Sequence, residues 1–140
     1  GQDVAATEWV QITQQQINQF AEATGDPQWI HIDVERAKQG PFGAPIAHGF
    51  LTLSLLSQFF DKTIDVRSKR MGVNYGLNKV RFTSPVQVNS RLRAHMHLLA
   101  CEAIDNNGRS NFTASVTSKA IGYGNDLRAD PCGVLINFAI

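Results

Sequence analysis

The sequence lacks the features that mark several large classes of protein. It has two cysteines in 140 residues, Cys101 and Cys132, and no CxxC pair, so nothing points to a secreted disulfide scaffold. It has no apolar run approaching about 18 residues and no basic-then-apolar leader. These absences predict a reduced, cytoplasmic protein with neither a membrane span nor a signal peptide.

An excess of charge of one sign is also absent. Lysine and arginine number 13 and acidic residues 12, which leaves a formal net charge of +1. Nucleic-acid or membrane partners are therefore not expected, and any anion site must be local. The composition, with 43% hydrophobic and 18% charged residues, is ordinary for a globular protein, and 140 residues without a repeat or linker fit one domain.

The first part of the chain carries helical patterns separated by turns. Thr13 opens a capping-box pattern, and apolar residues then recur at helical spacing until Gly25. A shorter helix is expected over residues 34–39, with Asp33 as its cap. The glycine- and proline-rich segment 40–45 predicts a loop.

A long apolar segment and a series of strand patterns fill the rest. Residues 46–60 are apolar on almost every side, which is typical of a buried helix. With the strands that follow, they predict an α+β fold in which a curved antiparallel sheet wraps around a long buried central helix, the hot-dog arrangement. Such folds usually pair two sheets edge to edge, so a homodimer is expected. The predicted segments are strands at 8–12, 71–82, 91–102, 109–121 and 132–140, a hairpin turn at 106–108 and a polar loop at 125–131.

Asp26 and His31 are the first candidates for chemistry. Gly25 ends the preceding helix, so Asp26 is expected at a sharp corner. Apolar neighbours such as Trp29 and Ile30 would keep water from the carboxylate and make it a stronger base, and the imidazole could share a water with it. A capping aspartate and a buried structural histidine explain the same residues, and this motif alone does not separate the two interpretations.

Gly49 follows His48 near the start of the apolar helix. The first turn of a helix carries free backbone N–H groups and a partial positive charge. A glycine there lets a carbonyl oxygen approach its N–H closely, as an oxyanion hole requires. The alternative is a glycine needed only for tight packing of the helix against the sheet.

The motifs resemble those of a known enzyme family. The run FAEATGDPQWIHIDVERA, residues 20–37, is similar to the signature of the (R)-specific enoyl-CoA hydratases, the MaoC-like dehydratase family. PIAHGFLTLSLLSQFF resembles the family's central helix and VNYGLNKVRFTSPV one of its strands, so residues 1–140 would form a single MaoC-like hot-dog domain. Gln28 and Trp29 stand where the family usually has Asn-Pro, a difference that bears on the shape of the pocket.

The resemblance implies an (R)-specific enoyl-CoA hydratase. Such an enzyme adds water syn across trans-2-enoyl-CoA and gives (R)-3-hydroxyacyl-CoA, reversibly. Asp26 and His31 would hold and activate the water, and the Gly49 N–H would polarise the thioester carbonyl. Ser57 matches a pocket serine of the family. No metal and no bound cofactor would be required, because the CoA thioester enters as the substrate.

Further residues are expected to meet the substrate. Lys79 and Arg81 share one strand face by period two and could contact the CoA phosphates, as could the basic residues within 67–70. His95 and His97 also share a strand face, but no third metal ligand is evident. The remaining substrate-binding candidates are His48, Trp29, Tyr75 and Asn78.

Two other functions fit the same fold. An acyl-CoA thioesterase also uses a carboxylate near a helix N-terminus, although not normally with this Gly-Asp and Ile-His spacing. A non-catalytic acyl-thioester-binding module would keep the pocket without the chemistry. Release of free thiol would mark the first, and binding without turnover would mark the second.

Overall fold

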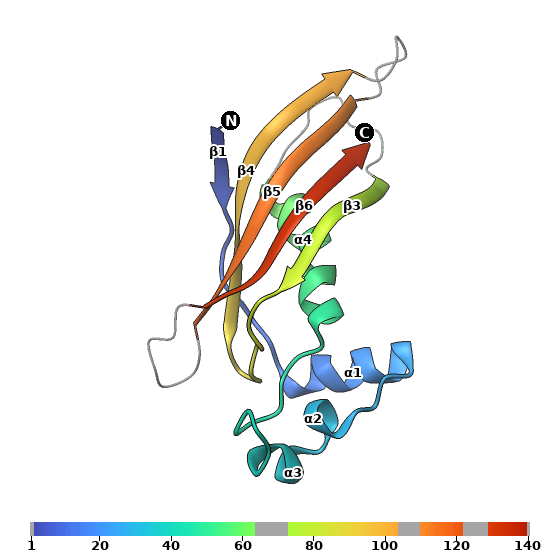
Figure 1. The fold of residues 1–140 in the computed structure, drawn as a ribbon, viewed down its shortest axis with the longest axis vertical. Coiled ribbons are helices and arrows are strands. Elements are labelled where there is room, and N and C mark those ends of the chain that lie inside the picture. The colour runs from blue at the N-terminus through green and yellow to red at the C-terminus, as the bar shows by residue number, and fades with distance from the viewer. Residues whose placement is uncertain (1, 64–72, 104–109, 122–128, 140) are drawn as a thin grey trace.

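A computed structural model describes residues 2–63, 73–103, 110–121 and 129–139. The chain forms one antiparallel sheet with a long helix beside it, and shorter helices gather beyond one end of the sheet (Figure 1). The predicted α+β class is confirmed.

Within the described residues the sheet has six strands, all paired antiparallel. The order is β1-β4-β5-β6-β3, and β2 also pairs with β4. Strand β3 therefore forms one edge of the sheet, and β1 and β2 lie along the other. The strands are β1 (Gln2–Ala6), β2 (Val10–Gln11), β3 (Val73–Phe82), β4 (Arg91–Ala103), β5 (Ser110–Ile121) and β6 (Ala129–Ala139).

The predicted strands are present, with corrections at their ends. β6 begins at Ala129, inside the segment predicted as a polar loop, because Ala129 pairs with Ala120 of β5. The strand predicted at 8–12 is shorter in the structure, where β2 covers only Val10–Gln11. Strand β1 was not predicted, because it forms by pairing with β4, which is distant in the sequence. The hairpin turn predicted at 106–108 lies outside the described residues.

The residues that start and end the helices near the N-terminus make the contacts that the sequence predicts. Thr13 Oγ1 accepts the N–H of Gln16, and the Gln16 side chain accepts the N–H of Thr13 in return. Gly25 ends the first helix with a left-handed φ of 70°, and Asp33 caps another by accepting the Arg36 N–H. The second helix was not predicted. The helices are α1 (Gln14–Thr24), α2 (Trp29–Ile32), α3 (Val34–Lys38) and α4 (Gly49–Thr63).

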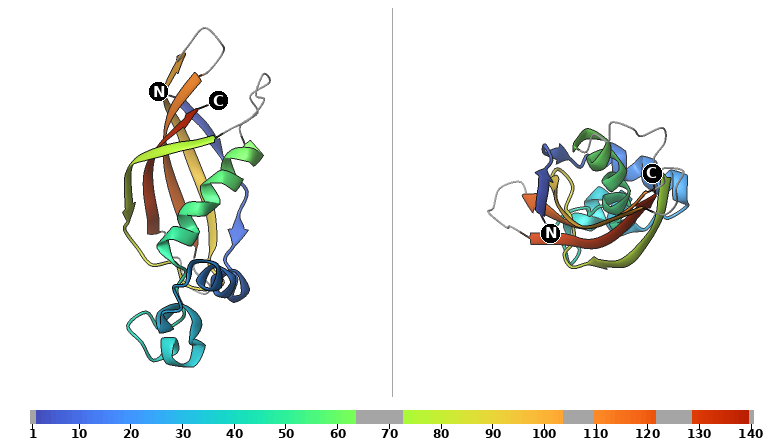
Figure 2. Two further views of the ribbon diagram at one scale, coloured as in Figure 1. Left: turned by 90° about the vertical axis from the view of Figure 1, so that its right-hand side faces the viewer. Right: turned by 90° about the horizontal axis from the view of Figure 1, so that it is seen from above.

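Helix α4 lies along the concave side of the sheet, which curves around it (Figure 2). Leu51, Leu55 and Phe59 of α4 are buried. They join one core with Leu92 and Met96, whose side chains point inward from β4. Burial of such side chains, at about 1.5–3 kcal/mol each, holds α4 against the sheet.

The other side of α4 is open within the described residues. Phe50 is 68% exposed, and Ser54 and Ser57 are exposed as well. The helix is therefore buried on one side rather than on every side. It also begins at Gly49 rather than at residue 46, because Ile46 forms a β-bridge with a distant residue. No helix of the described part, α4 included, is long and apolar enough to cross a membrane.

We expect Gly25→Ala to lower the free energy of unfolding by about 1 kcal/mol. A Cβ at Gly25 would meet no atom within 4 Å, so the loss would come from the left-handed backbone and not from a clash. Gly76→Ala is the matched control, since its Cβ also meets nothing and its φ is not positive. Urea unfolding measures both, and equal stability of the two variants would contradict this account of the corner.

Candidate active site

Asp26 sits at a fixed corner between α1 and α2. After the left-handed Gly25, the Asp26 N–H donates to the carbonyl oxygen of Ala21 at 3.1 Å. The main chain is thus held as the sequence predicts. The side chain is 44% exposed, however, so Trp29 and Ile30 do not withdraw the carboxylate from water as expected.

His31 lies on α2 and is only 6% exposed. Its Nδ1 is 2.7 Å from the carbonyl oxygen of Ile46. Because a carbonyl oxygen can only accept, Nδ1 carries the proton and donates it. The neutral ring therefore keeps a lone pair on Nε2, where it can take up a proton.

Burial lowers the pKa of His31 below 6.5. Loss of water around the charged ring is the largest cause. The Ile46 hydrogen bond raises the pKa, the nearby His48 lowers it, and Asp26 raises it. Since the net shift is downward, the imidazole is neutral at pH 7 and can act as a proton acceptor.

His48 lies directly before α4 and is 3% exposed. Its Nε2–H donates to the main-chain oxygen of Asp26 at 3.0 Å, and Nε2 is 4.0 Å from Asp26 Oδ2. The ring stacks on that of His31, with centroids 3.7 Å apart and planes 28° from parallel. The sequence analysis expected His48 to contact substrate, and here it contacts the two candidate catalytic residues.

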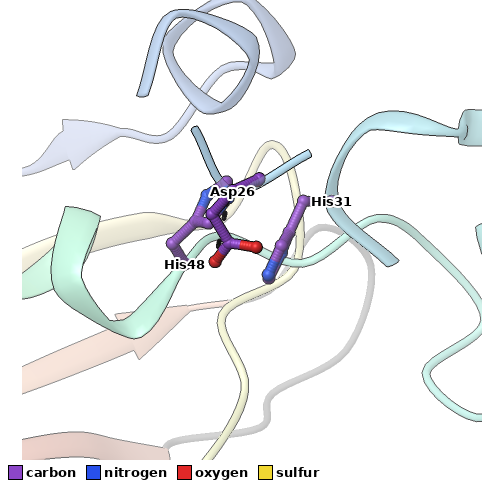
Figure 3. A group of neighbouring side chains, drawn as sticks. All are labelled: Asp26, His31 and His48. Atoms are coloured by element: carbon purple, nitrogen blue, oxygen red, sulfur yellow. Dashed lines mark hydrogen bonds and ion pairs between the residues drawn. The ribbon is translucent and has the colours of Figure 1, made fainter. Parts of the chain in front are cut away.

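Asp26, His31 and His48 come from three separate segments and gather into one cluster (Figure 3). One ligand atom of each lies within 4.8 Å of the others. Imidazole lone pairs lie in the ring plane, so two stacked, nearly parallel rings cannot both direct a lone pair at one ion. The arrangement suits proton transfer better than metal binding.

A pocket of about 330 Å³ joins His31 to the start of α4. This volume falls in the usual range for small-molecule sites. His31 and Gly49 line the same space, whereas Asp26 is not part of the lining and its carboxylate lies beside His31. The lining residues are His31, Phe42, Ile46, Ala47, Gly49, Thr52, Phe82, Thr83, Ser84, Pro85 and Val86.

Gly49 is the first residue of α4. The Thr52 N–H donates to the carbonyl oxygen of His48, which starts the helical hydrogen bonding. The Gly49 N–H itself has no acceptor among the described residues, as expected in a first turn. A Cβ at Gly49 would lie 3.0 Å from the ring of Phe82. Both interpretations of this glycine, free donor and close packing, are therefore supported.

The predicted substrate contacts whose side chains are described all lie outside the pocket lining: Trp29, His48, Ser57, Lys79 and Arg81. The Trp29 ring packs against Gly40, and the guanidinium carbon of Arg36 lies 4.4 Å from its centroid. Ser57 is exposed on α4, two turns beyond the pocket. Trp29 here supports the loop that follows α3 rather than the pocket wall.

The remaining predictions fall on or near the edge strand β3. Lys79 and Arg81 are exposed on β3 and could meet a charged ligand. Tyr75 and Asn78 also lie on β3, but their side chains, like residues 67–70, are outside the described part of the chain.

The pocket also contains residues that the sequence analysis missed. Phe82 ends β3, and the following turn, residues 83–86, forms one wall with it. Thr52 is buried in the wall, and its hydroxyl donates to the Gly49 carbonyl oxygen at 2.7 Å. No local motif marks these residues, because the bridge between Ile46 and Gln87 brings the segments together from far apart in the sequence.

Comparison with known proteins identifies a family. The family described as "MaoC like domain" matches residues 1–120. The chain is 49% identical to 3-hydroxyacyl-thioester dehydratase Z of Mycobacterium tuberculosis, over 87% of this chain and 80% of that protein.

Solved structures share the fold. A monoamine oxidase regulatory protein from Archaeoglobus fulgius superposes with a TM-score of 0.79 at 25% identity, covering 100% of this chain and 90% of that one. The unliganded R-hydratase PhaJ1 from Pseudomonas aeruginosa superposes with a TM-score of 0.72 at 19% identity, covering 99% and 81%.

A neutral imidazole, a carboxylate and a free helix N–H beside one pocket form the set of groups that adds or removes water next to a carbonyl. The family match spans most of the chain, and the dehydratase relative is similar over most of both sequences. The protein belongs to the MaoC-like dehydratase family and is a hydro-lyase with the hot-dog fold.

Proposed function

We propose that the protein catalyses the reversible syn addition of water to trans-2-enoyl-CoA, giving (R)-3-hydroxyacyl-CoA. The observation that carries the proposal is that His31 and Gly49, the first residue of α4, line one pocket, with the Asp26 carboxylate beside His31. The (R) configuration rests on the resemblance of residues 20–37 to the signature of the (R)-specific hydratases.

The substrate would enter with its thioester carbonyl oxygen toward the Gly49 N–H. That donor, at the positive end of α4, stabilises the negative charge that develops on the oxygen when C3 is attacked. A hydrogen bond of this kind is worth about 3–4 kcal/mol to the transition state. It would also fix the position of the carbonyl in the pocket, with C2 and C3 of the substrate directed toward His31.

Asp26 and His31 would hold the water that attacks C3. The oxygen of the water bonds to C3, one of its protons passes to the Asp26–His31 pair, and the pair delivers one proton to C2. Water and proton come from groups within 4.8 Å of each other, on one side of the double bond, which favours syn addition. Carbonyl polarisation and both proton transfers are assigned to Gly49, Asp26 and His31, so the proposed reaction has no step that calls for a metal or a cofactor.

The CoA part of the substrate would reach the pocket from outside. Lys79 and Arg81 are exposed cations on β3, the strand that ends at pocket residue Phe82. Cations near a pocket mouth attract phosphates at a range of about 8–10 Å at physiological salt. Tyr75 and Asn78 of the same strand and Ser57 of α4 remain predicted contacts along this route.

We expect Asp26→Asn and His31→Gln each to reduce hydration by about 10²–10⁴-fold, since each removes one of the groups that exchange protons with water. Loss of enoyl absorbance from crotonyl-CoA measures the rate, and chiral analysis of the product identifies its configuration. Asp33→Asn is the matched control, because it removes a nearby exposed charge while an amide oxygen can still cap α3.

Wild-type turnover in either variant would exclude the assigned roles. Release of free thiol by the wild-type protein would instead indicate a thioesterase, and binding of acyl-CoA without either reaction would indicate a binding module.

We expect Gly49→Pro to lower kcat about 10²–10³-fold below that of Gly49→Ala. Both variants place a Cβ against Phe82, but only proline removes the N–H, and proline is tolerated at the first position of a helix. Comparing the steady-state kinetics of the two variants therefore separates the effect of losing the N–H from the effect of the contact between Cβ and Phe82. Equal kcat in the two variants would show that the N–H has no part in the reaction.

We further propose that two copies pair through β3. This strand is an edge of the sheet, and edge strands present unpaired backbone groups to a partner. Leu77 on β3 is 45% exposed, which suits burial in an interface.

Light scattering should give the mass of two chains at micromolar concentration. Leu77→Glu should shift the protein toward one chain, whereas Leu77→Met should not. A monomer in the wild type would exclude the pairing.

A further inference from the structure

We propose that His48 is a positioning residue that holds the Asp26 main chain and the His31 ring in one arrangement and ties both to Gly49. The readout in activity rests on the proposed function, but the arrangement itself can be tested without a substrate. No chemical step is assigned to His48.

The first contact fixes Asp26. The Nε2–H of His48 donates to the main-chain oxygen of Asp26 at 3.0 Å across 22 residues of sequence. Helix α1 ends just before Asp26, so this oxygen lies outside the helix and needs a donor from elsewhere. The bond orients the peptide that carries the carboxylate.

The second contact fixes His31. The two rings stack at 3.7 Å, while Nδ1 of His31 is bound to the carbonyl oxygen of Ile46. A ring held by one hydrogen bond can still rotate about it. The stack against His48 removes that freedom and leaves His31 Nε2 in one direction.

The third link is covalent. His48 precedes Gly49, and its carbonyl oxygen accepts the Thr52 N–H that opens α4. The distance between the candidate oxyanion donor and the Asp26–His31 pair is therefore set through a single residue. Misplacement of reacting groups by about 1 Å can cost about 10²-fold in rate, so this link matters.

His48 itself lies away from the pocket that would hold the substrate. It is 3% exposed, it does not line the pocket, and Phe20 packs near it with ring centroids 5.0 Å apart. Its Nδ1 is buried with no hydrogen-bond partner among the described residues. An apolar side chain would avoid that unsatisfied atom but would leave the Asp26 oxygen without its donor, so the imidazole at this position is explained by its contact with Asp26.

His48 also affects the ionisation of His31. The titratable side chains that face His31 in the described structure are His48, ahead of α4, and Asp26, from the α1–α2 corner. His48 lowers the pKa of His31, so its replacement by a neutral side chain should raise that pKa. A proton acceptor with a raised pKa is neutral only at higher pH, and the acidic limb of kcat/KM should move upward.

Two variants of His48 distinguish the effect of its hydrogen bond to Asp26 from the effect of its stacking on His31. His48→Gln keeps an N–H donor near the position of Nε2 but loses the ring, and His48→Phe keeps a stacking ring but loses the donor. We expect kcat to fall about 10–100-fold in His48→Phe and less in His48→Gln, with KM changed by less than about 3-fold in both. Thermal unfolding shows whether each variant is folded.

NMR titration of the His31 ring provides a readout that needs no substrate. We expect its midpoint to rise in both variants relative to the wild type. Unchanged kcat and an unchanged His31 midpoint in folded His48→Phe would overturn the proposal, as would a loss of activity that follows only the loss of thermal stability. A wild-type protein without hydratase activity but with the expected His31 shifts would contradict the proposed function and leave the positioning intact.

Discussion

The candidate site depends on one residue of extended chain, Ile46. Its N–H donates to the carbonyl oxygen of Ile30 at 3.0 Å, and its carbonyl oxygen accepts from His31 Nδ1 at 2.7 Å. The next residue, Ala47, donates its N–H to Val86 at 2.7 Å. Residues 46–47 are thus hydrogen-bonded to α2 on one side and to the 83–86 turn on the other. Helix α4 starts shortly after them, at Gly49.

The same hydrogen bond gives His31 its chemical character. It fixes the tautomer with the proton on Nδ1, and burial keeps the ring neutral. Asp26 differs, since its carboxylate is 44% exposed and remains in contact with water. Two titratable groups in such different surroundings can divide the work, one holding a solvent water and the other exchanging a proton.

The sequence predicted those parts of the site that depend on near neighbours. Asp26 and His31 are five residues apart and directly follow a helix that ends at Gly25, so their proximity follows from local backbone rules. Phe82 and the 83–86 turn could not be found in this way, because their contact with α4 depends on sheet pairing between distant segments. The α+β class followed from the order of patterns, but β1 had no signal apart from its pairing with β4.

Local and distant parts of the site meet at Gly49. Its N–H belongs to the first turn of α4, a helix that the sequence predicted to begin at residue 46, whereas the ring of Phe82, 3.0 Å from where a Cβ would stand, comes from the end of β3. The first residue of α4 therefore lies close to a side chain on an edge strand. A shift of β3, by pairing with a partner or by ligand contacts on Lys79 and Arg81, would change the contact between Phe82 and Gly49 in the pocket wall. The position of the proposed oxyanion donor is in this way coupled to the strand that would contact the charged end of the substrate.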